Sequence, residues 1–134
     1  MSTSRLHYGW AVLLAGTLAV FSALGLARFG YTMVLPAMQA ALGMNNAEAG
    51  LLATFNMAGY LTFVILGGAL CTRYGARLVI VAGLVCAGIG MIGTGWADRF
   101  FTVALWRGLT GVASGAANIG VMGLLPAWFA SRRR

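Results

Sequence analysis

The chain is 134 residues long; 60% of them are hydrophobic, only 8% are charged, and the net charge is +7, from nine arginines against two acids. A soluble domain has about a quarter of its residues charged, so this composition excludes a soluble single domain. Four apolar stretches reach the roughly 20 residues that a helix needs to cross a bilayer. They predict an all-α, polytopic membrane bundle of four transmembrane helices in a single region, 1–134.

The first apolar stretch, over residues 8–42, is too long for one upright crossing, because at 1.5 Å per residue it makes a helix of about 52 Å. Two crossings would need a turn near Arg28, but Gly25 to Gly30 contains no Asn, Asp, Ser or Pro to favour one. We therefore predict one long, tilted helix over 8–42, bent near Gly30 and Pro36.

The three later helices are shorter and are joined by short connections. Asn45 and Glu48 have the spacing of a capping box and mark the start of the second helix. The predicted helices are 47–71, 77–97 and 100–129. A turn at 73–77 joins the second to the third. Because Thr94 is the only polar side chain within the third span, we expect that helix on the lipid-facing periphery.

Arginines outside the spans indicate how the chain is oriented. With a cytoplasmic N-terminus, Arg99 is the only arginine on the outer side and six lie on the inner side. The six are Arg5, Arg73, Arg77, Arg132, Arg133 and Arg134. Cytoplasmic loops are enriched in Arg and Lys, so this distribution favours N- and C-termini both in the cytoplasm. Topology thus explains the positive charge, and no nucleic-acid partner is expected.

Polar residues recur at helical spacing on three of the predicted helices. On the fourth helix they lie within an arc of about 80° at 100° per residue, so they share one face, which we expect to line a cavity. These residues are Arg107, Thr110, Ser114 and Asn118. The first helix carries Arg28, Tyr31, Thr32 and Gln39, and the second carries Asn56 and Tyr60. Beside the stripe of the fourth helix, small residues that permit close helix packing form a second stripe, Gly108, Gly111 and Gly115.

Two arginines inside predicted spans need compensation, because arginine at the centre of a bilayer costs at least about 2.5–3.5 kcal/mol. The two acids of the chain, Glu48 and Asp98, are both expected at the outer surface, so neither can pair with them there. Either a bound anion or further protein must supply negative charge, or the arginines hold the bundle together through backbone carbonyls. We favour ligand binding for Arg28 and a structural role for Arg107.

Three segments resemble one known family. Gly68 to Arg77 reads GALCTRYGAR, which resembles the G-x-L-A-D-R-x-G-R-R signature between helices 2 and 3 of the major facilitator superfamily. Arg107 to Gly115, RGLTGVASG, resembles its helix 4 motif. Leu26 to Pro36, LARFGYTMVLP, is similar to the first helix of its bacterial porters, with some likeness to the organophosphate antiporters, where a helix 1 arginine contacts substrate phosphate. Thr72 and Ala76 depart from the signature, where the family has an acid and a base.

The resemblance implies a secondary active transporter of small, anionic organic solutes that works by alternating access in a bacterial-type cytoplasmic (inner) membrane. Such porters have twelve spans in two halves, so four spans imply an incomplete N-terminal half and helices missing from this chain. The implied partners are the lipid bilayer, the small-molecule substrate, and either a proton or a counter-anion. No cofactor and no metal are implied.

The resemblance also implies roles for particular residues. Arg28 is expected to anchor the anionic group. The expected substrate-binding residues are Arg28, Tyr31, Thr32, Asn56, Tyr60, Arg107, Thr110, Ser114 and Asn118. The expected gating loop consists of Gly68, Thr72, Arg73, Gly75 and Arg77.

A different class of function remains open from the sequence. A stand-alone four-helix accessory or structural membrane protein without transport activity would use the same glycines for helix association. An enzyme is not expected, because the sequence has no metal-ligand cluster, nucleophile and base pair, or phosphate-cradling loop.

Overall fold

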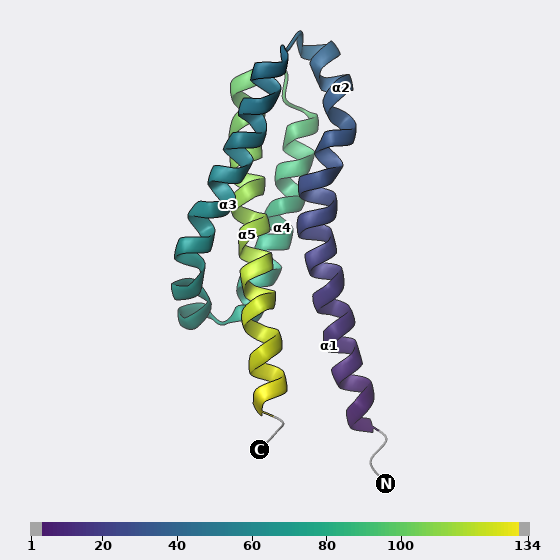
Figure 1. Cartoon of the computed structure of the whole chain (residues 1–134), viewed down its shortest axis with the longest axis vertical. Helices are drawn as coiled ribbons and strands as arrows, with labels where there is room; N and C mark the ends of the chain where they lie inside the picture. The colour runs from purple at the N-terminus through teal and green to yellow at the C-terminus, as the bar shows by residue number, and fades with distance from the viewer. Residues whose placement is uncertain (1–3, 132–134) are drawn as a thin grey trace.

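The computed structural model describes residues 4–131, without the side chains of residues 4–8, 28, 125 and 127–131. The elements in chain order are α1 (Ser4–Val20), the π-helical segment η1 (Phe21–Phe29), α2 (Gly30–Leu42), α3 (Asn46–Tyr74), α4 (Ala76–Gly95) and α5 (Phe100–Ser131). Successive helices run up and down. The α2–α3 and α4–α5 connections share one end of the bundle, and the α3–α4 connection lies toward the end where α1 begins and α5 finishes (Figure 1).

The prediction of an all-α membrane bundle of four helices is confirmed. Among the described residues, three helical stretches are long and apolar enough to cross a membrane, namely Gly9–Leu42, Asn46–Tyr74 and Ala76–Gly95. The fourth helix, α5, is 32 residues long and packs between the others. Large apolar side chains are exposed along all of the helices, as expected where lipid is the solvent.

The first helical stretch is continuous from Ser4 to Leu42, in agreement with the expected single helix. Its irregular part, however, is η1, on the N-terminal side of the predicted bend at Gly30 and Pro36. There the backbone forms wider turns, and the amide of Gly30 donates to the carbonyl of Gly25, five residues back. Pro36 lies inside α2 without ending it.

Both short connections around α3 have clear local causes. The capping box is confirmed: the Asn45 side chain accepts a hydrogen bond from the Glu48 amide at 2.8 Å, and the Glu48 carboxylate accepts one from the Asn45 amide at 2.9 Å. The predicted five-residue turn at 73–77 is too long. Only Gly75 separates α3 from α4, and its φ of 87° is a conformation that glycine adopts without steric cost.

The core of the bundle is α5, which packs along both α3 and α4. Glycines bring these helices close enough for backbone contact. A Cβ atom at Gly111 would overlap the carbonyl oxygen of Asn56 on α3, and one at Gly83 of α4 would lie 2.8 Å from the carbonyl oxygen of Ala113. Small residues at helix interfaces allow this approach, which maximises dispersion contacts where lipid supplies no hydrophobic driving force.

The helix expected at the lipid-facing periphery, α4, has two different faces. One face buries a ladder of small and polar residues, Val79, Gly83, Ala87, Gly90 and Thr94, mostly against α5. The other exposes Val81, Val85, Ile89 and Ile92. The expectation is therefore right for only one face, because small residues spaced three or four apart form a packing surface without any polar side chain.

Replacing Gly111 with alanine should destabilise the bundle by about 1–3 kcal/mol, because the added methyl group collides with the backbone of α3. The measurement is the thermal unfolding midpoint by circular dichroism in detergent. Gly123→Ala on the same helix is the matched control, since a Cβ atom there meets open space. Equal midpoints for the two variants would show that the two helices do not pack this closely.

Candidate functional site

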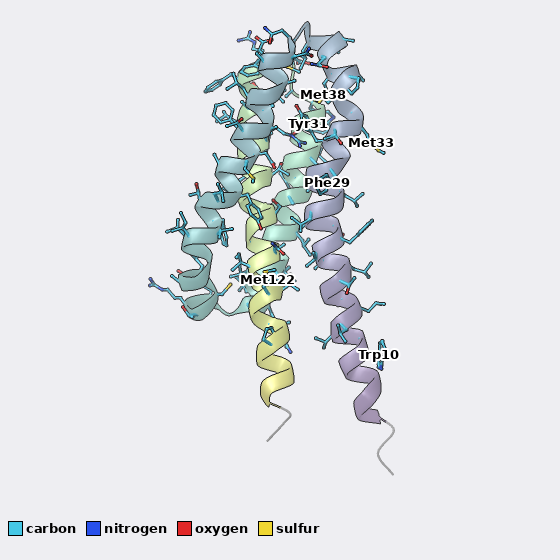
Figure 2. All side chains as sticks on the ribbon, in the orientation of Figure 1. Trp10, Phe29, Tyr31, Met33, Met38 and Met122 are labelled. Atoms are coloured by element: carbon cyan, nitrogen blue, oxygen red, sulfur yellow. The ribbon has the colours of Figure 1, made fainter. Side chains whose placement is uncertain are left out.

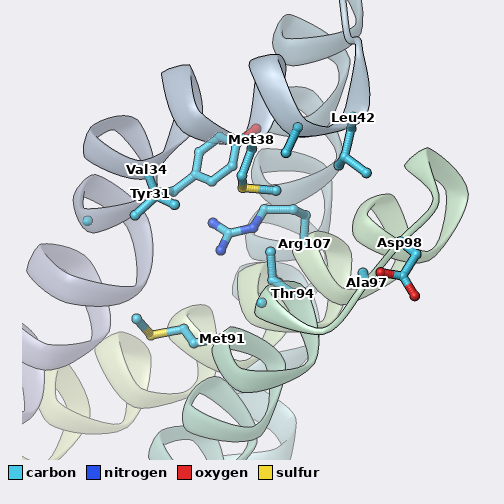
Figure 3. Close-up of a pocket in the computed structure, with 12 residues that line it drawn as sticks. Tyr31, Val34, Met38, Leu42, Met91, Thr94, Ala97, Asp98 and Arg107 are labelled. Atoms are coloured by element: carbon cyan, nitrogen blue, oxygen red, sulfur yellow. The ribbon is translucent and has the colours of Figure 1, made fainter.

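The centre of the candidate site is the contact between Arg107 on α5 and Tyr31 on α2. Arg107 is only 4% exposed and Tyr31 8%. The guanidinium carbon lies 4.2 Å from the centroid of the Tyr31 ring, and the two side chains face each other (Figure 3). On the same helix Tyr31 points into the bundle, whereas Met33 points away and is 87% exposed (Figure 2). The attraction between a cation and the face of an aromatic ring therefore links α2 to α5.

This buried pair is incompletely satisfied. Among the described residues, neither Nε of Arg107 nor the hydroxyl group of Tyr31 has a hydrogen-bond partner. More than nine in ten buried polar groups in proteins have one. Asp98 is the nearest acid in sequence, but its carboxylate points away from the guanidinium group (Figure 3). The site therefore presents a positively charged side chain whose Nε donor is unpaired among the described residues.

Two cavities flank this pair, and Tyr31 and Arg107 belong to the walls of both. One has a volume of about 600 Å³ and lies between α2, α4 and α5. The other has a volume of about 620 Å³ and lies between α2, α3 and α5. Both volumes are in the range of small-molecule sites. The guanidinium group thus stands where a solute in either cavity could reach it.

The two cavities differ in chemistry. The first is lined largely by apolar and thioether side chains, with Thr94 and Asp98 as its other polar residues; the apolar ones include Val34, Met38, Leu42 and Met91. The second carries a polar wall of Thr32, Gln39, Asn46, Thr54 and Asn56. A solute with a polar part and an apolar part could be accommodated on the two sides of α2.

Asn56 connects α3 to the same position of α5. Its Nδ2 atom donates to the carbonyl oxygen of Arg107 at 3.0 Å, and the side chain is buried. Gln39 and Asn46 close the α2–α3 end of the second cavity with a side-chain hydrogen bond of 3.1 Å. Arg107 is thus contacted from two neighbouring helices, at its backbone by Asn56 of α3 and at its side chain by Tyr31 of α2.

The rest of the predicted polar stripe lies outside the walls of both cavities. Thr110 donates to the carbonyl of Trp106 at 2.7 Å, and Ser114 donates to that of Gly111 at 2.9 Å. Asn118 donates to the hydroxyl oxygen of Tyr60 on α3 at 2.8 Å. These contacts satisfy the polar groups inside the packed α3–α5–α4 unit. A role for Thr110, Ser114, Asn118 and Tyr60 in substrate binding remains a prediction.

The residues expected on the first helix have mixed outcomes. Tyr31 and Thr32 line the cavities, and the Thr32 hydroxyl also donates to the carbonyl of Phe29 at 2.6 Å. Arg28 belongs to η1, but its side chain lies outside the described residues, so its expected contact with an anion remains a prediction.

The expected gating residues lie at the far end of α3 from the cavities. The Thr72 hydroxyl, at the position of the family's acid, donates to the carbonyl of Ala69 at 2.8 Å. The guanidinium carbon of Arg73 is 5.6 Å from the centroid of the Tyr74 ring. Gly68, Gly75 and Arg77 flank the same connection. Their role in gating remains a prediction.

The sequence reasoning did not assign several cavity residues to the site. Met38 and Met91 carried no signal, since methionine is ordinary in a membrane helix. Thr94 was set aside because α4 was expected at the periphery, and Asp98 because it was expected at the outer surface; Thr94 is buried, and both line the first cavity. Gln39, seven residues after Thr32 and therefore on the same helical face, was named in the polar line of the first helix but not among the expected substrate-binding residues.

A comparison with known families decides the family of the protein. Residues 17–134 match the model of the Major Facilitator Superfamily. The chain belongs to the major facilitator superfamily. It is therefore a multi-pass membrane protein from a family of membrane transporters, as its apolar helices also indicate.

Two curated relatives that the chain resembles are plant proteins. The chain is 32% identical over 90 residues to "Probable anion transporter 3, chloroplastic" of Arabidopsis thaliana, which covers 66% of the chain. It is 30% identical over 94 residues to "Probable anion transporter 2, chloroplastic" of Oryza sativa subsp. japonica, which covers 69% of the chain. The match covers 18% of the length of each relative. No solved structure matches the chain significantly.

Replacing Arg107 with methionine should stabilise this facilitator chain by about 1 kcal/mol or more, because it removes an incompletely paired buried charge and keeps the Asn56 bond to the backbone carbonyl. Thermal unfolding in detergent measures the change. Arg99→Met, at an exposed turn position, should leave the midpoint nearly unchanged. If Arg107→Met alone lowered the midpoint, the arginine would be a structural element of the bundle.

Proposed function

We propose that this chain forms the substrate-binding part of a secondary transporter that moves small organic anions by alternating access. The observation that carries the proposal is the buried, incompletely paired Arg107, placed in the walls of two cavities. Arginine presents a planar set of donors that matches carboxylate and phosphate groups, and it keeps its charge.

The charge balance of the chain supports an anion. The only acids are Glu48, which caps α3, and Asp98, in the α4–α5 turn. A buried guanidinium group without a carboxylate partner is costly in a membrane, and a bound anion reduces that cost. A site of this kind therefore favours anionic over neutral or cationic solutes.

The comparisons support the same class of solute. Both curated relatives are described as probable anion transporters. The aligned part of each includes only 18% of its length, so most of each relative lies outside the region similar to this chain. Membership of the superfamily supports transport by alternating access between two sides of the membrane.

Neutralising Arg107 should raise the KM for anion uptake by about 10–100-fold. This factor corresponds to the loss of a charge-assisted hydrogen bond of about 1.5–3 kcal/mol. The assay measures the rate of uptake of radiolabelled organic carboxylates and phosphates into proteoliposomes as a function of solute concentration. The proteoliposomes contain the complete purified transporter. The variants are Arg107→Gln and Arg28→Gln, with Arg99→Gln as control.

The control should transport like the unchanged protein, because Arg99 is exposed in a turn. A loss in Arg28→Gln as well would place both arginines on the substrate. Uptake by Arg107→Gln with unchanged KM would exclude Arg107 from substrate binding.

We also propose that α1 begins, and α5 ends, on the cytoplasmic side of a bacterial-type cytoplasmic membrane. The arginine distribution supports this orientation, since Arg73 and Arg77 flank the α3–α4 connection and Arg99 lies in the α4–α5 turn at the other end (Figure 1).

An impermeant maleimide should label Arg99→Cys, and not Arg73→Cys, in sealed right-side-out membrane vesicles. Both positions are exposed, and Cys71 and Cys86 are first replaced by serine. Permeabilised vesicles, in which both cysteines should react, provide the control for reactivity. Labelling of Arg73→Cys in sealed vesicles would reverse the proposed orientation.

A further inference from the structure

A second site is indicated by a groove between α1 and α4 on the surface of α5, toward the end where α1 begins. Its volume is about 210 Å³. The walls include Val12, Ala15 and Ala19 of α1, Ile80 of α4 and Val121 of α5, together with Arg77. The groove is separate from the two cavities at Arg107 and shares no residue with them.

The shape of the groove follows from the small residues of α1. Ala15, Gly16 and Ala19 form one stripe of that helix, and all three belong to the groove wall. They leave room where larger residues would fill the space between the helices. The result is an elongated apolar surface along the helix axis, which suits a hydrocarbon chain better than a polar solute.

The charge at the groove is positive and unopposed. Among the side chains that the structure describes, Arg77 is the only charged one in its wall, and it is exposed, one residue after the start of α4. Glu48 and Asp98 lie at the other end of the bundle, near the α2–α3 and α4–α5 connections. A long basic side chain at the end of a membrane helix extends toward the level of the lipid headgroups.

We propose that this groove binds one anionic phospholipid, with the phosphate on Arg77 and an acyl chain lying along α1 and α4. Basic pockets between membrane helices bind anionic headgroups because the guanidinium fork pairs with phosphate oxygens and the apolar wall contacts the chain. Among the described residues, no acidic side chain near the groove would repel the negative charge of such a headgroup. This proposal does not depend on the transported solute.

The test uses the purified full chain in phosphatidylcholine vesicles that contain a trace of spin-labelled phosphatidylglycerol or spin-labelled phosphatidylcholine. Electron spin resonance measures the fraction of each labelled lipid that the protein immobilises, and hence the preference for phosphatidylglycerol. The variants are Arg77→Gln, which removes the charge, and Ala15→Phe, which fills the groove and keeps the charge. Arg73→Gln is the matched control, because Arg73 is an exposed arginine at the same end that lies outside the groove wall.

We expect Arg77→Gln to lower the preference about fivefold, the contribution of one basic residue near an anionic headgroup. Ala15→Phe should lower it as well, with unchanged helicity by circular dichroism, and Arg73→Gln should retain it. The proposal would be overturned if the unchanged protein showed no preference, as when another helix covers the groove. An unchanged preference in Arg77→Gln would also overturn it. Equal losses in Arg73→Gln and Arg77→Gln would do so too, because they would indicate diffuse surface charge.

Discussion

The close approach of α5 to α3 and α4 is the constraint on which the rest of the structure depends. Inside a membrane, lipid tails are as apolar as leucine, so helices associate through contact area and hydrogen bonds instead of through the hydrophobic effect. Gly111 against Asn56, and Gly83 against Ala113, bring the backbones together. Hydrogen bonds between helices then become possible, and buried polar groups such as Asn118 find partners within the protein.

The same packing separates a dense part of the molecule from an open one. The unit of α3, α5 and α4 is closely packed, whereas α2, which contacts Arg107 of α5 through Tyr31, has a cavity on each of its sides. Arg107 stands at the boundary, held from one side by Asn56 and covered from the other by the tyrosine ring. A charged side chain held in place beside open space has the arrangement found in small-molecule sites, where a few fixed polar groups face a largely apolar cavity.

The sequence allowed the fold to be predicted well where one residue type dictates one local structure. The four helices followed from apolar length, and the start of α3 followed from the Asn45 and Glu48 pair. The shared face of Arg107, Thr110, Ser114 and Asn118 could be derived from helical periodicity, but periodicity does not say which neighbour covers that face. Here α3 and α4 cover most of it, and of these four residues Arg107 alone belongs to the walls of the two described cavities. The role of Thr94 was missed for a related reason, since it depends on how α4 packs against α2 and α5. The α3–α4 turn was predicted too long because the sequence does not show that Gly75 alone, at a positive φ, suffices to reverse the chain.

The π-helical segment η1 couples distant parts of the first helix in a way that a regular helix would not. In an α-helix each residue turns the chain by about 100°, so gaining or losing one residue in the wider turns would rotate everything beyond them by about that angle. The hydrogen bond from the Gly30 amide to the Gly25 carbonyl oxygen, five residues back, shows the wider turn that this segment has in the structure. Tyr31 lies two residues after the end of this segment, and its position over Arg107 therefore depends on how far the backbone rotates within η1. The number of residues in the wider turns of η1 therefore determines which face of α2 lines the two cavities, as much as the side chains of α2 themselves do.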